Sequence, residues 1–418
     1  MRINKILLAT ACLIISASSF VFAQEEDVIK QSTTKQWYES LKLGGYLQFR
    51  YNDLYKSNPD MENDQGDKTY GGYKGFSIRR MRLKVSGFVH ERVYVYVQMD
   101  FASDGKNLGQ LRDAYADLYL DEKKEFFLRV GQHKVPYGYD NLLSSQHRIP
   151  LDRSDPVNSA LKNERDLMMT LYWLPQSVKT IFGEMKKEGL KFTGSYGMAG
   201  LGIYNGQTAN TLIPDVDKKK HVVARFTYPF KLSSGQFMEA SVQGYSGTYV
   251  TTEVSEGVNV KGVFEQGAGG ELVPVSAYKY GWDDYRVAAT FNIYPQPLGL
   301  QAEYNIGKGP EYDKATNTID LKSLGGGYAT VMYRIKTKKS VWYPYCRYMY
   351  YDGGKKSEAD ARSYTVSEVE TGVEWQFFKN KAELVVAYVY ADRRYEDAVK
   401  PDNRQFGDLV RIQFQFNF

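Results

Sequence analysis

The sequence predicts an all-β protein, a transmembrane antiparallel β-barrel of 16 strands, with 18 strands as the alternative count. Three observations support this fold class. Apolar and polar residues alternate along most of the chain, which is the period of a β-strand with two unlike faces. The chain begins with the pattern of a secretory leader. It also ends on an alternating strand whose last residue is Phe418, as bacterial outer-membrane barrels do.

Residues 1–23 are predicted to be a signal peptide. Arg2 and Lys5 precede an apolar run over residues 6–15, and Val21-Phe22-Ala23 offers small residues for cleavage. The apolar run is shorter than the roughly 20 residues that span a bilayer, which disfavours a membrane anchor. We therefore expect export from the cytoplasm.

Cleavage would leave residues 24–40 as a short periplasmic segment and residues 41–418 as the barrel domain. It would also remove Cys12, so that Cys346 stands alone. The sequence thus predicts no intrachain disulfide and no thiolate metal cluster. Mean hydropathy is low (−0.49), yet the chain carries 35 Tyr and 21 Phe. That composition is typical of barrels, where only alternate residues touch lipid and aromatic girdles line both interfaces.

The strands follow from the alternation, read in chain order. Sixteen is an even number, as a single-chain bacterial barrel with both termini on one side requires. The strands are expected near 41–51, 76–89, 93–103, 111–121, 126–133, 167–174, 190–204, 220–228, 236–248, 280–293, 299–306, 324–335, 341–351, 362–376, 382–391 and 407–418.

The connections support the same arrangement. Short turns alternate with long loops, as between the periplasmic and extracellular ends of such barrels. Residues 175–189 are the exception, because they are long but fall on the short side; either this turn is enlarged or a hairpin is missed, which would give 18 strands. The short turns include 90–92, 121–124 and 378–381, and the long loops are 52–75, 134–166, 205–219, 249–279, 307–323 and 392–406.

A barrel of this size implies a pore. Unpaired backbone groups in lipid cost several kcal/mol each, so a sheet in a membrane must close on itself. Sixteen strands enclose a lumen too wide for side chains of the wall to fill. The architecture therefore predicts an aqueous channel.

The alternation in residues 79–101 orients the charges. Arg80, Arg82 and Lys84 alternate with apolar residues, and the reverse orientation would place three cations in lipid at roughly 2–4 kcal/mol each near the midplane. These cations are therefore predicted to face the lumen. The same reasoning places further polar residues inside: Lys42, Tyr46, Gln48, Arg50 and Arg129.

Two interpretations of the lumen remain open at this point. Asp100, Asp113 and Asp117 also take inward positions, so the charges can form a mutually neutralising network along the wall. Alternatively, the arginines and lysines form an electropositive path that attracts anions, as in anion pores.

The longest loop, residues 134–166, is predicted to be functional rather than disordered, since it contains several leucines and an isoleucine. Folding into the barrel would bury these apolar residues and narrow the lumen. The alternative is a lid outside the barrel. Inward folding would bring five basic residues near the opposite wall: Lys134, His147, Arg148, Arg153 and Arg165.

Several stretches resemble the phosphate-selective porin O and P family. They are residues 45–50, 76–83, 111–115, 130–138 and 164–166. The resemblance implies a sixteen-stranded outer-membrane porin, usually trimeric, with inward-folded loops and basic side chains that guide anions. It also implies that the Arg79-Arg80 pair and Lys134 lie where such porins place constriction cations, and Asp113 where they place a nearby acid.

The predicted function is passive diffusion of small anionic solutes, such as phosphate, through the bacterial outer membrane. We predict no enzyme activity, catalytic residue, cofactor, metal or nucleic-acid partner. The expected partners are the solutes, outer-membrane lipid, the barrel-assembly machinery at Phe418 and two further copies in a homotrimer. A general or weakly selective porin, an adhesin or assembly partner, and an outer-membrane hydrolase are the alternatives. The predicted constriction and anion-binding residues are Arg79, Arg80, Arg82, Lys84, Asp113, Lys134, His147, Arg148, Arg153 and Arg165.

Overall fold

The computed structural model describes residues 36–56, 75–102, 109–161, 164–207, 209–210, 218–260, 264–266, 272–274, 281–378 and 380–418. The predicted signal peptide, residues 1–23, and most of the segment 24–40 lie outside the described residues. The described part of segment 24–40 ends in a short 3-10 helix, η1 (Trp37–Ser40). Across the described ranges, no helix is both long and apolar enough to cross a membrane.

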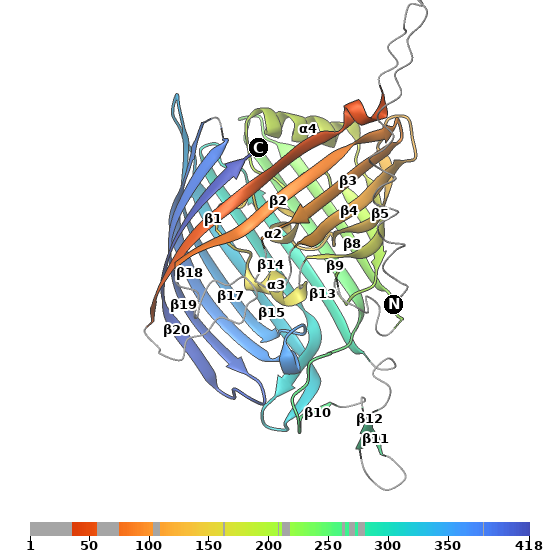
Figure 1. Cartoon of the computed structure of the whole chain (residues 1–418), viewed down its shortest axis with the longest axis vertical. Helices are drawn as coiled ribbons and strands as arrows, with labels where there is room; N and C mark the ends of the chain where they lie inside the picture. Colours follow the sequence, from red (N-terminus) through yellow and green to blue (C-terminus); the bar gives the residue numbers. More distant parts are fainter. Residues whose placement is uncertain are drawn as a thin grey trace, which may run out of the picture. The chain divides into compact units, whose positions relative to one another are not determined.

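Sixteen antiparallel strands form a closed barrel (Figure 1), which confirms the predicted fold class and strand count. β20 pairs with β1, and Gly45 and Phe418 exchange two backbone hydrogen bonds of 2.9 and 3.1 Å at this seam. The barrel strands are β1 (Lys42–Lys56), β2 (Gly75–His90), β3 (Val93–Asp100), β4 (Gln110–Tyr119), β5 (Phe126–Lys134), β6 (Arg165–Trp173), β7 (Ala199–Tyr204), β8 (His221–Lys231), β9 (Phe237–Tyr249), β13 (Trp282–Ile293), β14 (Leu298–Asp313), β15 (Thr318–Tyr333), β17 (Val341–Gly354), β18 (Ser363–Phe377), β19 (Ala382–Glu396) and β20 (Asn403–Asn417).

The remaining elements are short. A two-residue strand lies beside β15 and another beside β17, and a small hairpin forms a separate two-stranded sheet. The described residues also form three α-helices and a second 3-10 helix. These elements are β10 (Asn259–Val260), β16 (Ile335–Lys336), β11 (Phe264–Gln266), β12 (Leu272–Pro274), α2 (Tyr139–Leu142), α3 (Asp155–Ala160), α4 (Gln176–Lys187) and the 3-10 helix η2 (Ala359–Ala361).

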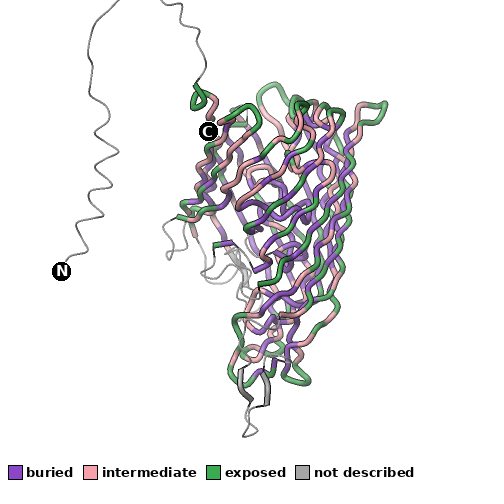
Figure 2. The backbone as a smooth tube through the Cα atoms, turned by 90° about the vertical axis from the view of Figure 1, so that its right-hand side faces the viewer, coloured by how far each residue is buried: buried purple, intermediate pink, exposed green. Residues whose placement is uncertain are grey.

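Buried and exposed residues alternate along the strands, as Figure 2 shows. In β8, Arg225 and Thr227 are buried whereas Val222 and Phe226 are exposed. This polarity is the reverse of a soluble sheet, because apolar side chains face outward and polar ones face the filled interior. Arginines are among the largest fully buried side chains for the same reason.

The predicted strand over 190–204 is wrong in its first half. β7 begins only at Ala199, and the long connection 175–189 contains α4, so the enlarged-turn alternative applies. Gly194 and Gly197 have φ angles of +91° and +67°, which are incompatible with a strand. The apparent alternation over residues 190–198 arises because Leu190 packs under α4 while neighbouring residues face the lumen.

Two predicted long loops are also mostly strand. β14 and β15 pair as far as Asp313 and Thr318, and β19 and β20 are joined by residues 397–402 alone. The backbone ladder thus continues beyond the length that a membrane requires. The loops predicted over 307–323 and 392–406 are therefore short turns at the ends of long hairpins.

The segment between β5 and β6 lies inside the barrel, where α2 and α3 are seen in Figure 1. Most of residues 135–161 are buried. Val135, Tyr137 and Ala160 pack with Tyr204, Val223 and Tyr245 of the wall, and Ile149 and Leu151 pack with Tyr343 and Tyr345. We call residues 135–161 the inner loop. It divides the interior and positions the candidate site.

Candidate functional site: the constricted lumen

A β-bulge in β2 places two adjacent arginines on the lumen side. Gln48 of β1 lies opposite Arg80, but the next residue, Phe49, lies opposite Ile78, so Arg79 is the extra residue. Strict alternation would send Arg79 towards lipid. With the bulge, its guanidinium lies 3.5 Å from the Asp152 carboxylate inside the barrel. Arg80 donates to the Gln48 side chain at 2.9 Å.

A second β-bulge, in β4, also places two adjacent charged residues on the lumen side. Gln98 lies opposite Asp113 and Met99 opposite Leu111, which leaves Arg112 as the extra residue. Arg112 and Asp113 are both buried in the interior. Bulges therefore account for an additional lumen cation that alternation misses.

The inner loop is fixed to the wall by Asp152. Its carboxylate lies 2.8 Å from Arg50 of β1, 2.9 Å from Arg411 of β20 and 3.5 Å from Arg79 of β2. Burial raises the pKa of the Asp152 carboxyl, but the arginines outweigh burial and hold its pKa well below the ordinary value. One loop carboxylate thus joins three strands across the barrel seam.

Glu164, which lies between the inner loop and β6, is the second carboxylate at which several ion pairs meet. Four cations surround its carboxylate at 3.2–3.6 Å: Arg112, Lys134, Arg153 and Arg165. Burial raises the pKa of the Glu164 carboxyl, and these cations more than reverse that effect, so its pKa lies well below the ordinary value. Cations outnumber carboxylates around both Asp152 and Glu164.

The loop also covers carboxylates on the opposite wall. The backbone N–H of Tyr139 donates to Glu303 of β14, and the backbone N–H of Leu151 donates to Glu370 of β18 at 3.2 Å. Tyr137 donates to Asn305 of β14 at 2.7 Å. These contacts place the loop against β14 and β18 and shield acidic groups there.

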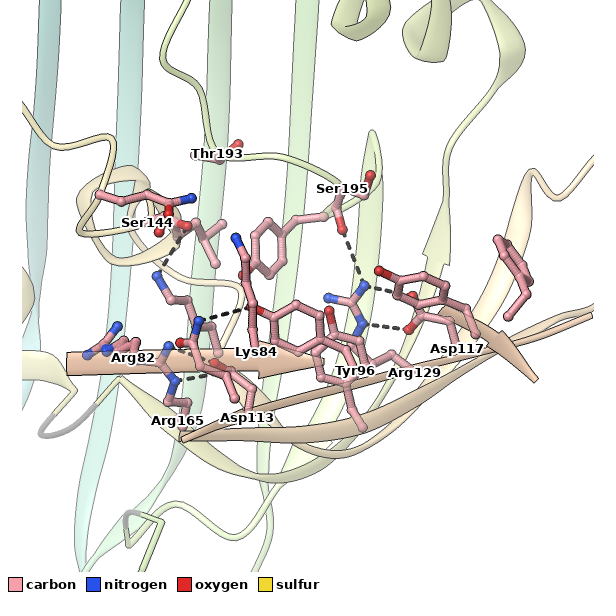
Figure 3. A pocket seen from close by; sticks show the side chains of 18 of the residues that line it. Arg82, Lys84, Tyr96, Asp113, Asp117, Arg129, Ser144, Arg165, Thr193 and Ser195 are labelled. Atoms are coloured by element: carbon pink, nitrogen blue, oxygen red, sulfur yellow. Dashed lines mark hydrogen bonds and ion pairs between the residues drawn. The ribbon is translucent and has the colours of Figure 1, made fainter. Parts of the chain in front are cut away.

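Open space remains on the other side of the loop, against β2–β5. A cavity of about 320 Å³ lies there (Figure 3). Lys84 of β2 lines it and makes no ion pair among the described residues. The two carboxylates of the lining are each held by an arginine: Asp113 by Arg165 at 2.9 and 3.1 Å, and Asp117 by Arg129 at 2.6 and 2.9 Å. Its basic lining residues are Arg82, Lys84, Arg129, Lys134 and Arg165.

A second cavity of about 680 Å³ adjoins the first, and both include Lys84, Ser144 and Gln146 in their linings. It is bounded by α4 and by residues 189–195. Lys191 from this segment reaches the carboxylates of Glu374 and Glu383 at 2.6 and 3.2 Å. The segment thus crosses to β18 and β19 at the end of the barrel that carries the short turns.

Eight of the ten predicted site residues fall into three groups. Arg79 and Arg80 lie near Asp152, and Lys134, Arg153 and Arg165 meet at Glu164. Arg82 and Lys84 line the cavity, where Asp113 pairs with Arg165. Arg148 is instead engaged within the loop by Asp140 at 3.0 Å. His147 lines the second cavity, and burial lowers the pKa of its imidazole to about 4, with Lys191 contributing in the same direction.

Sequence reasoning missed four residues of these clusters. Arg411 carried a usable signal, because it takes an inward position in the alternating terminal strand. Arg112 is hidden by its bulge, and nothing in the sequence distinguishes Asp152 from other loop acids. Glu164 carried a weaker signal, because it lies in the stretch 164–166 on which the family resemblance rests. Across the described residues, no group of three His, Cys, Asp or Glu side chains is arranged to hold a metal ion.

Comparisons with solved structures show the same barrel in known porins. The outer-membrane channel DcaP of Acinetobacter baumannii is 13% identical, with a TM-score of 0.51 over 90% of this chain and 97% of that chain. OmpT of Vibrio cholerae (10% identical) and an anion-selective porin from Comamonas acidovorans (9%) each give a TM-score of 0.51 over 91% of this chain and 99% of theirs. No curated protein matches the chain.

A closed sixteen-strand barrel with a segment folded into its lumen is the architecture that this chain shares with solved outer-membrane porins. A model of the family described as phosphate-selective porin O and P matches residues 42–418. The chain belongs to this family, which confirms the resemblance noted in its sequence and places the protein in the bacterial outer membrane.

Proposed function

We propose that the protein is a porin for passive diffusion of small anionic solutes, such as phosphate. One observation carries the proposal: the open cavity beside the inner loop is lined by five cations and two carboxylates, and both carboxylates are paired. A wall of this charge attracts anions and raises their local concentration.

The position of the inner loop supports the same preference. The loop covers Glu303 of β14 and Glu370 of β18, to which its backbone N–H groups donate. The basic strands β2–β5 are left beside the open space. A solute passing the loop therefore meets Arg82 and Lys84 rather than the covered acids.

A weakly selective porin is the second candidate, and a specific feature favours it. The bidentate pairs Arg165–Asp113 and Arg129–Asp117 neutralise two of the lining cations. The family description and the solved anion-selective porin from Comamonas acidovorans support the anion preference. An adhesin or a hydrolase has no comparable support in the site.

Three further assignments belong to the same proposal. Residues 1–23 act as a signal peptide. Phe418, at the end of the strand that closes the barrel, serves as the recognition residue for the barrel-assembly machinery. The functional unit is a homotrimer, in line with the trimer form described for the Vibrio cholerae OmpT structure.

Reversal potentials of the purified porin in planar bilayers, across a KCl gradient, test the anion preference. We expect chloride to permeate more readily than potassium. Arg82→Gln should lower the chloride-to-potassium permeability ratio by about twofold or more, because it removes a cation and leaves Asp100, 2.8 Å away, unopposed.

The matched control is Arg404→Gln. Arg404 also pairs with a carboxylate, Asp392, at 2.7 Å, but the pair is exposed on β19 and β20 and lies outside both cavity linings. This control should keep the wild-type ratio. A wild-type ratio at or below unity contradicts the proposal and leaves the porin class unaffected.

A further inference from the structure

We propose that the 320 Å³ cavity is a binding subsite for organic monoanions that carry a planar ring, such as aromatic carboxylates. This inference rests on the proposed anion channel and names the class of solute that its wall recognises. An inorganic ion needs only charged or polar groups in the wall, whereas a ring-bearing anion also gains from aromatic side chains. The lining contains such aromatic side chains.

Aromatic rings cover much of the cavity wall. Tyr96 and Tyr115 stack with ring centroids 5.2 Å apart and an interplanar angle of 16°, and Phe88 and Tyr119 stack at 5.9 Å and 28°. These rings, with Tyr94 and Tyr196, line the cavity and are half-buried, so part of each ring faces the open space.

Such a wall is of little use to a small hydrated inorganic ion. A planar solute, in contrast, gains both buried apolar area and ring–ring contact, and aromatic pairs contribute beyond the area that they bury. The tyrosine hydroxyls add polar edges to the same surface. The ring wall therefore favours solutes with an apolar, flat body.

The charge of the cavity matches a single negative group. Arg129 lies 4.1 Å above the Tyr115 ring and is held by Asp117, while Arg165 is held by Asp113. Arg82 pairs with Asp100, and Lys134 with Glu164. Among the described lining residues, Lys84 is thus the cation without an ion pair, and Figure 3 shows it pointing from β2 into the cavity.

Neutral polar groups complete the opposite side. Ser144 of the inner loop, with Thr193 and Ser195 from the segment after α4, lies on the other side of the cavity from Tyr96 (Figure 3), and Gln146 also lines the cavity. The volume is within the range of about 300–1,000 Å³ found for small-molecule sites. The site for a ring-bearing monoanion thus combines three features. They are the ammonium of Lys84, which has no ion pair among the described residues, the aromatic rings of the wall and the neutral polar groups of the lining.

Block of the chloride current in planar bilayers tests this assignment, with benzoate as the probe and acetate as the ringless carboxylate. We expect benzoate to block the wild-type channel at a concentration about three- to tenfold lower than acetate does. Both probes carry one carboxylate, so the difference isolates the ring.

Two variants then assign the block to the cavity. Tyr96→Leu keeps an apolar side chain but removes the ring, and should bring the benzoate block towards the acetate level. Lys84→Gln should weaken the block by both probes. Lys338→Gln in the exposed turn between β16 and β17 and Tyr388→Leu on the exposed face of β19 are the matched controls and should leave benzoate block unchanged.

Equal block by benzoate and acetate in the wild-type channel overturns the inference, and this comparison requires no variant to fold. Benzoate block that survives Tyr96→Leu and Lys84→Gln also overturns it, since the site would lie elsewhere. The chloride-to-potassium ratio is measured separately, so a channel that prefers chloride yet does not distinguish the probes retains the proposed function and loses only this subsite.

Discussion

The inner loop lies inside the barrel and the segment formed by α4 and residues 190–198 lies at its short-turn end, and the two are held by different forces. The inner loop is fixed mainly by charged groups: Asp152 joins three strands, and Glu164 collects four cations. The segment formed by α4 and residues 190–198 is fixed mainly by apolar packing of Val178, Phe182, Met185 and Leu190 against Phe127, Tyr172, Phe237 and Tyr294. Its main ionic tie is Lys191.

The difference suggests separate roles for the two segments: the inner loop should influence which ions pass, and the α4 segment should narrow one end of the barrel. Charged anchors place excess cations where the lumen is narrow, so the groups that hold the loop also determine the field that a solute meets. Apolar anchors leave the field unchanged and only shape the end of the barrel with the short turns. Substitutions in the two segments should therefore have different consequences.

The largest effect is expected for Asp152→Asn. Loss of this carboxylate leaves Arg50, Arg79 and Arg411 close together without their shared partner, and breaking a buried ion pair costs about 3–5 kcal/mol. The urea midpoint in detergent should fall, and single-channel conductance should rise as the loop detaches. Asp392→Asn, at an exposed ion pair with Arg404, is the control and should change neither quantity.

Met185→Ala should have a smaller effect of another kind. Met185 of α4 is fully buried, and truncating a buried Met to Ala costs about 2–5 kcal/mol, with the lower end expected at the barrel rim. The urea midpoint should fall while the chloride-to-potassium ratio stays at its wild-type value. A changed chloride-to-potassium ratio would contradict the view that the α4 segment shapes the barrel end without affecting ion selectivity.

The smallest effect concerns pH. The pKa of His147 is lowered to about 4 from its ordinary 6.5, so the unfolded chain binds a proton that the folded protein refuses as the pH falls between these values. Stability should therefore decline from neutral pH towards pH 4 and then level off. His147→Gln should flatten this part of the profile, whereas His90→Gln, at the exposed end of β2, should not.

The carboxylate anchors should respond at more acidic pH than His147. The pKa values of Asp152 and Glu164 lie well below their ordinary values, so their contribution to stability is complete above the unfolded-state pKa and is lost only as the pH falls through the lowered values. An inner loop that detaches near pH 5, seen as a rise in conductance, would contradict these ion pairs.

Alternation predicted the barrel and the facing of its strands, because a period of two is fixed by backbone geometry. It predicted Arg82 and Lys84 correctly as lumen residues. It could not place Arg79 or Arg112, since a bulge shifts the facing by one residue and has no composition of its own. Loop residues such as Asp152 and Glu164 follow no period, so their partners appear only when distant strands are brought together.

The inner loop lies against β14 and β18, and the open cavity lies on its other side, beside β2–β5. A solute in this cavity has strands on one side and the loop on the other, because Tyr96 of the wall and Ser144 of the loop line the same space. We expect a flat molecule to contact both surfaces with more of its area than a spherical molecule of equal volume. The off-centre loop should therefore make the passage discriminate between solutes by their shape.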